Sequence, residues 1–216
     1  MTSGELLKLF RSEMSDQIAP FLWSDVEVYS YIDDAQKMFC RKTDGLTDAT
    51  TTAVTQLAIA SGASYVPTHK SILKLRSVTR QDTGEPIEVV NFEDLATRGW
   101  RYDGTSGPIK ALVIGEEEHK ARTYPVANAN VVLKLLVFRM PLTTIESDDD
   151  LEIFEEHHRH LLHWVKCLAY SKQDSETTDK NKAIEFEGRF LSYCAQAQLE
   201  TRRKAHKHRT VEYGGI

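Results

Sequence analysis

Four side chains near residue 160 are of the types that bind transition metals. Glu156, His160, His163 and Cys167 recur at spacings of three and four, so they fall within about a 60° arc of a helix. Carboxylate, imidazole and thiolate groups are ligands that zinc accepts. One helix, however, cannot supply all four corners of a tetrahedron from successive turns. We therefore expect a polar face that contacts solvent or a neighbouring subunit, and keep a metal-binding enzyme as the alternative.

Two acidic runs are further candidates for chemistry. Asp148-Asp149-Asp150 could bind a divalent cation, but the run directly precedes a predicted helix. Carboxylates in that position cap free N–H groups and favour the positive end of the helix dipole, so we expect capping. Glu116, Glu117 and Glu118 follow a glycine between two predicted strands, which indicates an exposed hairpin turn. The functional alternative for this turn is an acidic surface that repels nucleic acid.

The most basic stretch of the chain is 202–209, which holds five cations and no acid: Arg202, Arg203, Lys204, Lys207 and Arg209. It has three interpretations. It is a charged segment that docks onto a protein, the solvated end of a helix whose dipole favours cations, or a nucleic-acid-binding module. The net charge of −5 argues against nucleic acid as the main partner, so we favour protein docking.

No local motif indicates catalysis. The turn 104–108 has two glycines but no following Gly-Lys-Ser/Thr, so it is not a phosphate loop. A Gly-x-Ser-x-Gly nucleophile elbow is also missing from the sequence. Trp100 and Tyr102 could stack on a sugar or a base, but we expect them to close one end of a β module. We predict no catalytic residues, no metal and no cofactor.

Amphipathic helices must position these candidates. Apolar residues at spacings of three and four predict long helices over 151–172 and 179–208, joined by a short acidic turn. Such a pair forms an antiparallel hairpin that buries its apolar faces on each other or on a third helix. The third helix is predicted over 24–44, where Ser24 and Glu27 have the capping-box spacing. A shorter helix is predicted over 3–15.

Between these helices the apolar period changes to that of strands. Five or six strands are predicted, over 51–60, 72–79, 85–90, 109–115, 120–124 and 131–139. The sequence thus predicts an α+β fold, in which a helical bundle carries an inserted antiparallel β module and an extended tail. The predicted boundaries are 1–46 for the N-terminal helices, 47–146 for the β module, 147–209 for the C-terminal helical hairpin and 210–216 for the tail.

Composition gives the broad class of the protein. Of its 216 residues, 41% are hydrophobic and 27% are charged, as in an ordinary soluble protein. No apolar run approaches the roughly 20 residues of a membrane span, and the N-terminus lacks the layout of a signal peptide. The three cysteines, Cys40, Cys167 and Cys194, are expected to be reduced thiols in a reducing compartment.

Several segments share the layout of a known family. They are Leu22-Trp23-Ser24-Asp25 leading into 31–43, Tyr65-Val66-Pro67, the turn 81–86, Tyr124-Pro125 before 131–141, the joint 174–179 and Val211-Glu212-Tyr213-Gly214-Gly215. In these features the chain resembles the head-to-tail adaptor proteins of tailed bacteriophages, also called connector or head-completion proteins, particularly those of short-tailed phages. The likeness covers roughly residues 22 to 216 and consists of layout and spacing rather than a catalytic signature.

The resemblance implies a structural virion protein with no catalytic activity, assembled in the host cytoplasm and located at the head–tail junction. Copies of the chain, typically twelve, would form a ring between the portal protein and the tail nozzle or hub protein. The ring would extend the channel, through which packaged DNA passes without specific binding, and would contact no membrane. We expect portal docking by Arg202, Arg203, Lys204, Lys207, Arg209, Val211, Tyr213 and Ile216, and possible channel-facing acids at Glu116, Glu117 and Glu118.

Overall fold

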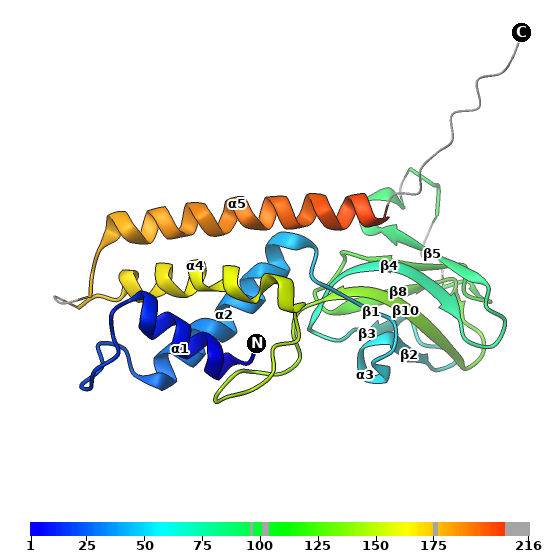
Figure 1. The fold of residues 1–216 in the computed structure, drawn as a ribbon. Coiled ribbons are helices and arrows are strands. Elements are labelled where there is room, and N and C mark those ends of the chain that lie inside the picture. The colour runs from blue at the N-terminus through cyan, green and yellow to red at the C-terminus, as the bar shows by residue number, and fades with distance from the viewer. Residues whose placement is uncertain (96, 101–103, 175–176, 206–216) are drawn as a thin grey trace, which may run out of the picture. The chain divides into compact units, whose positions relative to one another are not determined.

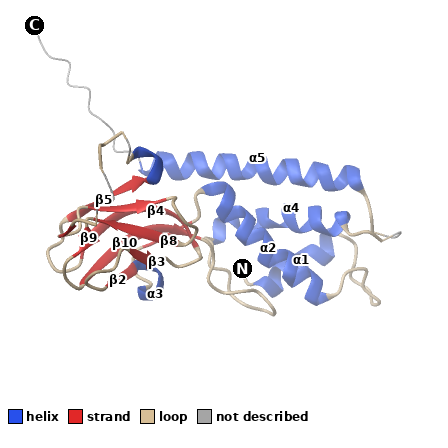
Figure 2. Cartoon of the chain, turned by 180° about the vertical axis from the view of Figure 1, so that it is seen from behind, coloured by secondary structure: helices blue, strands red, loops and turns tan. Residues whose placement is uncertain are grey.

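The chain divides into two compact units. The computed structural model describes residues 1–95, 97–100, 104–174 and 177–205. One unit is formed by Met1–Thr43 together with Thr143–Ile216, and we call it the helical unit. The other, Asp44–Leu142, is the β unit. The helices of the first and the strands of the second confirm the predicted mixed α+β class (Figures 1 and 2).

Four helices make the helical unit: α1 (Ser3–Glu13), α2 (Asp25–Thr43), α4 (Glu155–Ser171) and α5 (Lys180–Ala205). Helix α4 packs between α2 and α5, and α1 packs against α2 and α4 (Figure 1). Their shared core includes fully buried Phe10, Ile32, Leu161, Leu162 and Phe190. In the described chain, no helix is long and apolar enough to cross a membrane.

The ends of α2 follow local rules that the sequence shows. The Ser24 amide donates to Glu27 Oε2 (2.9 Å) and the Glu27 amide donates to Ser24 Oγ (3.3 Å), which is the predicted capping box. After α2 the backbone turns at Asp44 (φ 75°) and Gly45 (φ 82°). A Cβ at Gly45 would lie 2.7 Å from the carbonyl oxygen of Arg139, so the close approach requires glycine.

The β unit is a curled sheet with a short helix, α3 (Thr52–Thr55), and a 3-10 turn, η1 (Phe92–Asp94). The sheet order is β1-β10-β4-β5-β7-β8-β3, and β2 also pairs with β10. Its strands are β1 (Leu46–Asp48), β2 (Gln56–Ile59), β3 (Tyr65–Pro67), β4 (Ile72–Arg80), β5 (Pro86–Asn91), β7 (Ala111–Ile114), β8 (Lys120–Tyr124) and β10 (Val131–Arg139). Two short strands, β6 (Ser106–Gly107) and β9 (Val126–Ala127), pair separately.

Strand β10 connects three other strands of this sheet, because it pairs with β1, β2 and β4. Its alternate residues Leu133, Leu135 and Val137 are buried, as expected for one face of a strand on a core. On the neighbouring strand β4, Val78 is in register with Leu135 and is also buried. The core of the unit is therefore built around β10 and β4.

Two details of the predicted β module are wrong. The sheet is not antiparallel throughout, since β5 pairs parallel with β7 and β6 pairs parallel with β9. The connection from β5 to β7 is long enough to return the chain in the same direction, which a hairpin turn cannot do. Residues 52–55 form α3 instead of strand, because the Asp48 carboxylate accepts hydrogen bonds from the amides of Thr50 (2.9 Å) and Thr51 (3.0 Å) and turns the backbone.

Candidate functional site

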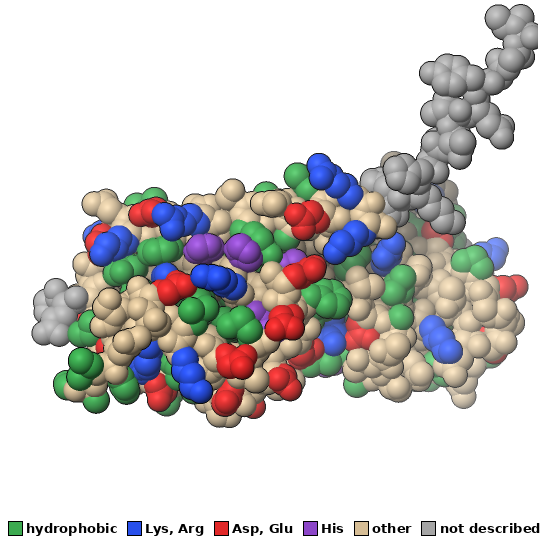
Figure 3. All heavy atoms as spheres, viewed as in Figure 1, with side chains coloured by type: hydrophobic (Ala, Val, Ile, Leu, Met, Phe, Trp, Pro, Cys, Tyr) green, Lys and Arg blue, Asp and Glu red, His purple; other side chains and the backbone are tan. Residues whose placement is uncertain are grey.

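The candidate metal face of α4 lies against α5. The ring of His160 stacks on Tyr193 with centroids 3.6 Å apart, and the ring of His163 lies 6.2 Å from that of Phe186. Histidine side chains line the boundary between α4 and α5 on the face that Figure 3 shows. Helix α5 of the same chain packs against this face, so His160 and His163 are half-buried, and their contact with a neighbouring subunit stays a prediction. Sequence periodicity placed these side chains on one side of α4, but it could not show that α5 packs against that side.

At this contact between α4 and α5, burial favours uncharged histidine rings and protonated cysteine thiols. Burial lowers the pKa of His160 and His163, and nearby cations lower it further. Burial raises the pKa of Cys167, and it raises the pKa of Cys194 on α5 to about 12. Within the described ranges, no group of three or more His, Cys, Asp or Glu residues is placed to hold a metal ion. In the described residues, this face of α4 is a contact between two helices.

The run Asp148-Asp149-Asp150 caps a helix, but not the predicted one. Helix α4 begins at Glu155, and Phe154, which the predicted apolar stripe included, is 71% exposed. Asp148 Oδ1 instead accepts a hydrogen bond from the amide of Gly4 (2.9 Å) in the first turn of α1. Hydrogen bonds from Thr2 and Gly4 lower the pKa of Asp148. The predicted capping of the following helix is therefore wrong: of the three carboxylates only Asp148 accepts from a helix amide in the described chain, and that helix is α1, about 140 residues away in the sequence.

The acidic turn joins β7 to β8, as predicted for an exposed hairpin. Glu116 Oε1 lies 3.1 Å from Nη1 of Arg122 and accepts a hydrogen bond from the Tyr65 hydroxyl (2.9 Å). Glu117 Oε2 lies 2.5 Å from Nζ of Lys120. Glu118 is exposed. Because two of the three carboxylates have cationic partners, this turn is less acidic than the sequence alone indicates. Its position on a channel stays a prediction.

The basic end of α5 is described as far as its last turn. Arg202, Arg203 and Lys204 are exposed there. Lys204 Nζ lies 3.5 Å from Oε1 of Glu156, and both side chains are more than half exposed, so this pair contributes little stability. The other predicted docking residues, Lys207, Arg209, Val211, Tyr213 and Ile216, lie outside the described residues. Docking by this segment stays a prediction.

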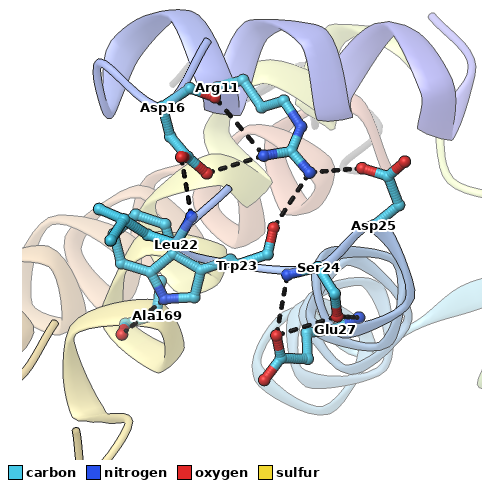
Figure 4. Close-up of polar contacts among 8 residues, drawn as sticks. All are labelled: Arg11, Asp16, Leu22, Trp23, Ser24, Asp25, Glu27 and Ala169. Carbon is cyan, nitrogen blue, oxygen red and sulfur yellow. Dashed lines mark hydrogen bonds and ion pairs between the residues drawn. The ribbon is translucent and has the colours of Figure 1, made fainter. Parts of the chain in front are cut away.

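A buried arginine organises the loop between α1 and α2, which the sequence indicated only as a gap between two predicted helices. Arg11 is 8% exposed. Its Nη1 donates to Asp16 Oδ2 (2.7 Å), and its Nη2 donates to the carbonyl of Trp23 (3.0 Å) and pairs with Asp25 (Figure 4). We call Arg11, Asp16, Trp23 and Asp25 the Arg11 cluster. Its members have no periodic spacing, so neither helix nor strand patterns could identify it.

The Arg11 cluster fixes both the start and the end of the loop. The other Asp16 oxygen, Oδ1, accepts a hydrogen bond from the amide of Leu22 (2.9 Å), and the Trp23 indole donates to the carbonyl of Ala169 on α4 (3.1 Å) (Figure 4). The Arg11 guanidinium lies 3.6 Å from the centroid of the Phe21 ring. The loop is therefore held by charged and polar contacts to α1, α2 and α4.

One family model matches the chain. The family is described as SU10 adaptor protein, and the match covers residues 1–211. It therefore includes α1 and the Arg11 cluster as well as the segments that show the resemblance to phage adaptors, except residues 212–215. A comparison with curated proteins found no match.

Proposed function

This chain belongs to the SU10 adaptor protein family, and we propose that its copies form a ring that joins the capsid portal to the tail. Membership makes the chain a structural component of a phage virion, a class of protein that acts by assembly rather than by catalysis. The proposed ring is a dodecamer that extends the DNA channel in a short-tailed phage. Its proposed partners are the portal protein on one side, the tail nozzle or hub protein on the other, and further copies of the chain.

The observation that carries this proposal is the family match over nearly the whole chain. Two features of the structure are consistent with assembly. Helix α5 is 26 residues long and ends in exposed Arg202, Arg203 and Lys204. The loop between α1 and α2 exposes apolar side chains although polar contacts hold it in place. Both surfaces are accessible to a partner.

We place the portal contact at residues 200–216. Exposed cations at the end of a helix interact only weakly with the helix dipole and with carboxylates of the same chain, so an acidic surface of a partner can compete for them. A contact of this kind accelerates association and is weakened by salt. The proposal therefore includes a salt-sensitive attachment of each copy to the portal.

Native mass spectrometry of the protein alone, and then mixed with the portal ring of the same virus, tests the proposal. We expect a free monomer and a complex that carries twelve copies on the portal. Deletion of 205–216 should abolish attachment and leave the circular dichroism spectrum and the melting temperature unchanged. Unchanged attachment of the deletion variant would refute the docking segment, and no attachment of the full chain would refute the ring.

A charge-reversal pair provides the matched control. Arg202→Glu with Arg203→Glu changes the end of α5, whereas Arg41→Glu with Lys42→Glu makes the same change at the exposed end of α2. Only the first variant should lose portal attachment. Equal losses in the two variants would indicate a general effect of net charge rather than docking by α5.

A further inference from the structure

The loop between α1 and α2 exposes five consecutive apolar residues, Ile18, Ala19, Pro20, Phe21 and Leu22, which we call the apolar loop. Ile18 is 85% exposed, Phe21 42% and Leu22 41%, and Val26 in the first turn of α2, which we count as part of the apolar loop, is 75% exposed. With about 150–200 Å² for a large apolar side chain, these fractions amount to about 400 Å² of apolar surface. Patches of roughly 300–600 Å² are the largest that monomers usually expose, and they are often functional.

The apolar loop is pre-organised. The Arg11 cluster holds it through Asp16, which binds both Arg11 and the Leu22 amide. Burying an arginine and a carboxylate carries a desolvation cost that a simple connection between two helices does not require. A loop that is already ordered loses less conformational entropy when a partner binds it. This arrangement is expected for a contact surface.

A complementary hollow lies on the opposite face of α4, where α4 meets the start of α5. It has a volume of about 350 Å³, and Cys167, Ala183 and Ile184 are among its lining residues, with Lys180 and Glu187. Ile184 is 67% exposed. From it an exposed stripe of apolar and small residues continues along α5 through Gly188, Leu191, Ala195 and Leu199. Their spacings of three and four place them on one side of the helix.

The apolar loop and the hollow lie at the same end of the helical unit but on opposite faces. Trp23 of the Arg11 cluster binds the carbonyl of Ala169, whereas Cys167 and Ser171 line the hollow. At 100° per residue, Cys167 and Ala169 point about 200° apart around α4. In Figures 1 and 2, α1 and α5 accordingly lie on opposite sides of α4. Both surfaces therefore occupy one level along the helix axis.

We propose that the apolar loop of one copy packs into the hollow between α4 and α5 of the next copy. This inference rests on the proposed ring, because a closed ring of more than two copies needs two different surfaces that fit each other. Because the two surfaces lie at the same height along the helix axis and on opposite faces, successive copies can be related by rotation alone, which closes a ring and does not build a helical filament. One charge on each surface has the opposite sign: Asp25, which pairs with Arg11 and has a side chain that is 56% exposed, adjoins the apolar loop, and Lys180 lines the hollow, together with Glu187.

The area explains why the occupant is a copy held in a ring rather than a free dimer partner. A stable interface buries about 800 Å² on each partner, and the apolar loop supplies about half of that. One such contact is too small to keep two free copies together. In a closed ring each copy makes two of these contacts, through its loop and through its hollow, and the portal holds the copies in place.

Cysteine cross-linking tests the contact. Cys40 and Cys194 are buried, and Cys167, which lines the hollow, is replaced by alanine in every variant, so introduced thiols at exposed positions react selectively. The variant with Ile18→Cys and Ile184→Cys is mixed with the portal ring and treated with a short bis-maleimide. We expect a ladder of dimers, trimers and larger products, because each copy carries one thiol for each neighbour. Either single variant should give no ladder.

Two controls make the test specific. Ile18→Cys with Glu185→Cys moves the second thiol about 100° around α5 and should cross-link far less. Ile18→Asp should prevent ring assembly on the portal while Gln17→Asp, at the neighbouring exposed position, should leave it unchanged. Both substituted side chains are exposed, so neither change should alter the fold.

The outcomes separate this inference from the proposed function. Rings with a ladder only for the Ile18/Ile184 pair support the contact. Rings without that ladder, an equal ladder for the control pair, or products that stop at dimers would overturn the contact and leave the ring intact. If the unmodified chain forms no ring on the portal, the proposed function fails, and the contact fails with it.

Discussion

Arg11→Met removes the guanidinium from the centre of the Arg11 cluster and keeps a side chain of similar length. The Arg11 and Asp16 side chains are 10% and 3% exposed, and their ion pair spans 2.7 Å. Without Arg11, the buried Asp16 carboxylate loses its partner and the Trp23 carbonyl loses a donor. Breaking a buried pair by removing one member costs about 3–5 kcal/mol. The pair with Asp25 adds little, because the Asp25 side chain is 56% exposed.

The measurement is urea unfolding followed by tryptophan fluorescence in a Trp100→Phe background. Trp100 belongs to the β unit, so the remaining Trp23 and Trp164 report the helical unit. We expect Arg11→Met to lower the free energy of unfolding by about 3–5 kcal/mol. Asp16→Asn in the same background should also destabilise. The double variant should lose less than the sum of the single losses, with a coupling energy of about 1–3 kcal/mol.

Arg189→Met is the matched control in the same unit. Arg189 pairs with Glu185 on α5, and both side chains are more than half exposed. Its loss should cost about 0.3–0.5 kcal/mol, as for exposed pairs one helical turn apart. If Arg11→Met costs no more than Arg189→Met, or if the two changes in the Arg11 cluster are additive, then the cluster does not hold the loop as argued.

Two further predictions concern pH and the β unit. Burial lowers the pKa of His157, His160 and His163 below the value of about 6.5 in the unfolded chain. Their contribution to stability is therefore present above pH 6.5 and is lost as pH falls through the lowered pKa values. The urea midpoint of the helical unit should fall between pH 7.5 and pH 5, and it should fall less in His163→Phe. A midpoint that does not change with pH would contradict this. Burial alone would raise the pKa of Asp48, but hydrogen bonds from Thr51, Thr50 and Arg139 outweigh it and hold that pKa far below its usual range. Asp48→Asn should destabilise the β unit by about 1.5–3 kcal/mol, measured by Trp100 fluorescence. The variant should also lose less stability below about pH 4 than the natural chain does. An unchanged unfolding curve would show that the carboxylate is dispensable.

Local patterns were sufficient for the elements whose signal lies within one segment. Strand β10 was predicted at its observed bounds, because its alternate residues face a core and Gly, Pro or Asn flank it. Helix α2 was predicted from its apolar spacing and its capping box. The polar side chain of Asp48, which turns the chain into α3, has no periodic signal, and the strand prediction therefore extended too far.

Contacts between distant segments were beyond the sequence. The acidic run at 148–150 was predicted to cap the next helix, but Asp148 instead accepts from an amide of the helix that begins at Ser3, and only the fold brings the two together. The same holds for the pairing of Glu116 with Arg122 and Tyr65, which reduces the charge of a turn that the sequence presents as acidic. Arg11 carried no signal at all, since an arginine in a short amphipathic helix is normally exposed.

The proposed portal contact is electrostatic, whereas the proposed contact between copies is apolar. This difference predicts the order in which the two contacts form. The end of α5 offers exposed cations, which act over several ångströms and steer a copy toward an acidic partner. The apolar loop offers about 400 Å² of apolar surface, which stabilises only after close contact and does not depend on salt. A copy in solution therefore has no contact large enough to hold a neighbour. Once the portal has gathered copies side by side, each loop meets a hollow at an effective concentration that free copies do not reach. Ring closure then follows portal docking, and the apolar loop need not be covered before it.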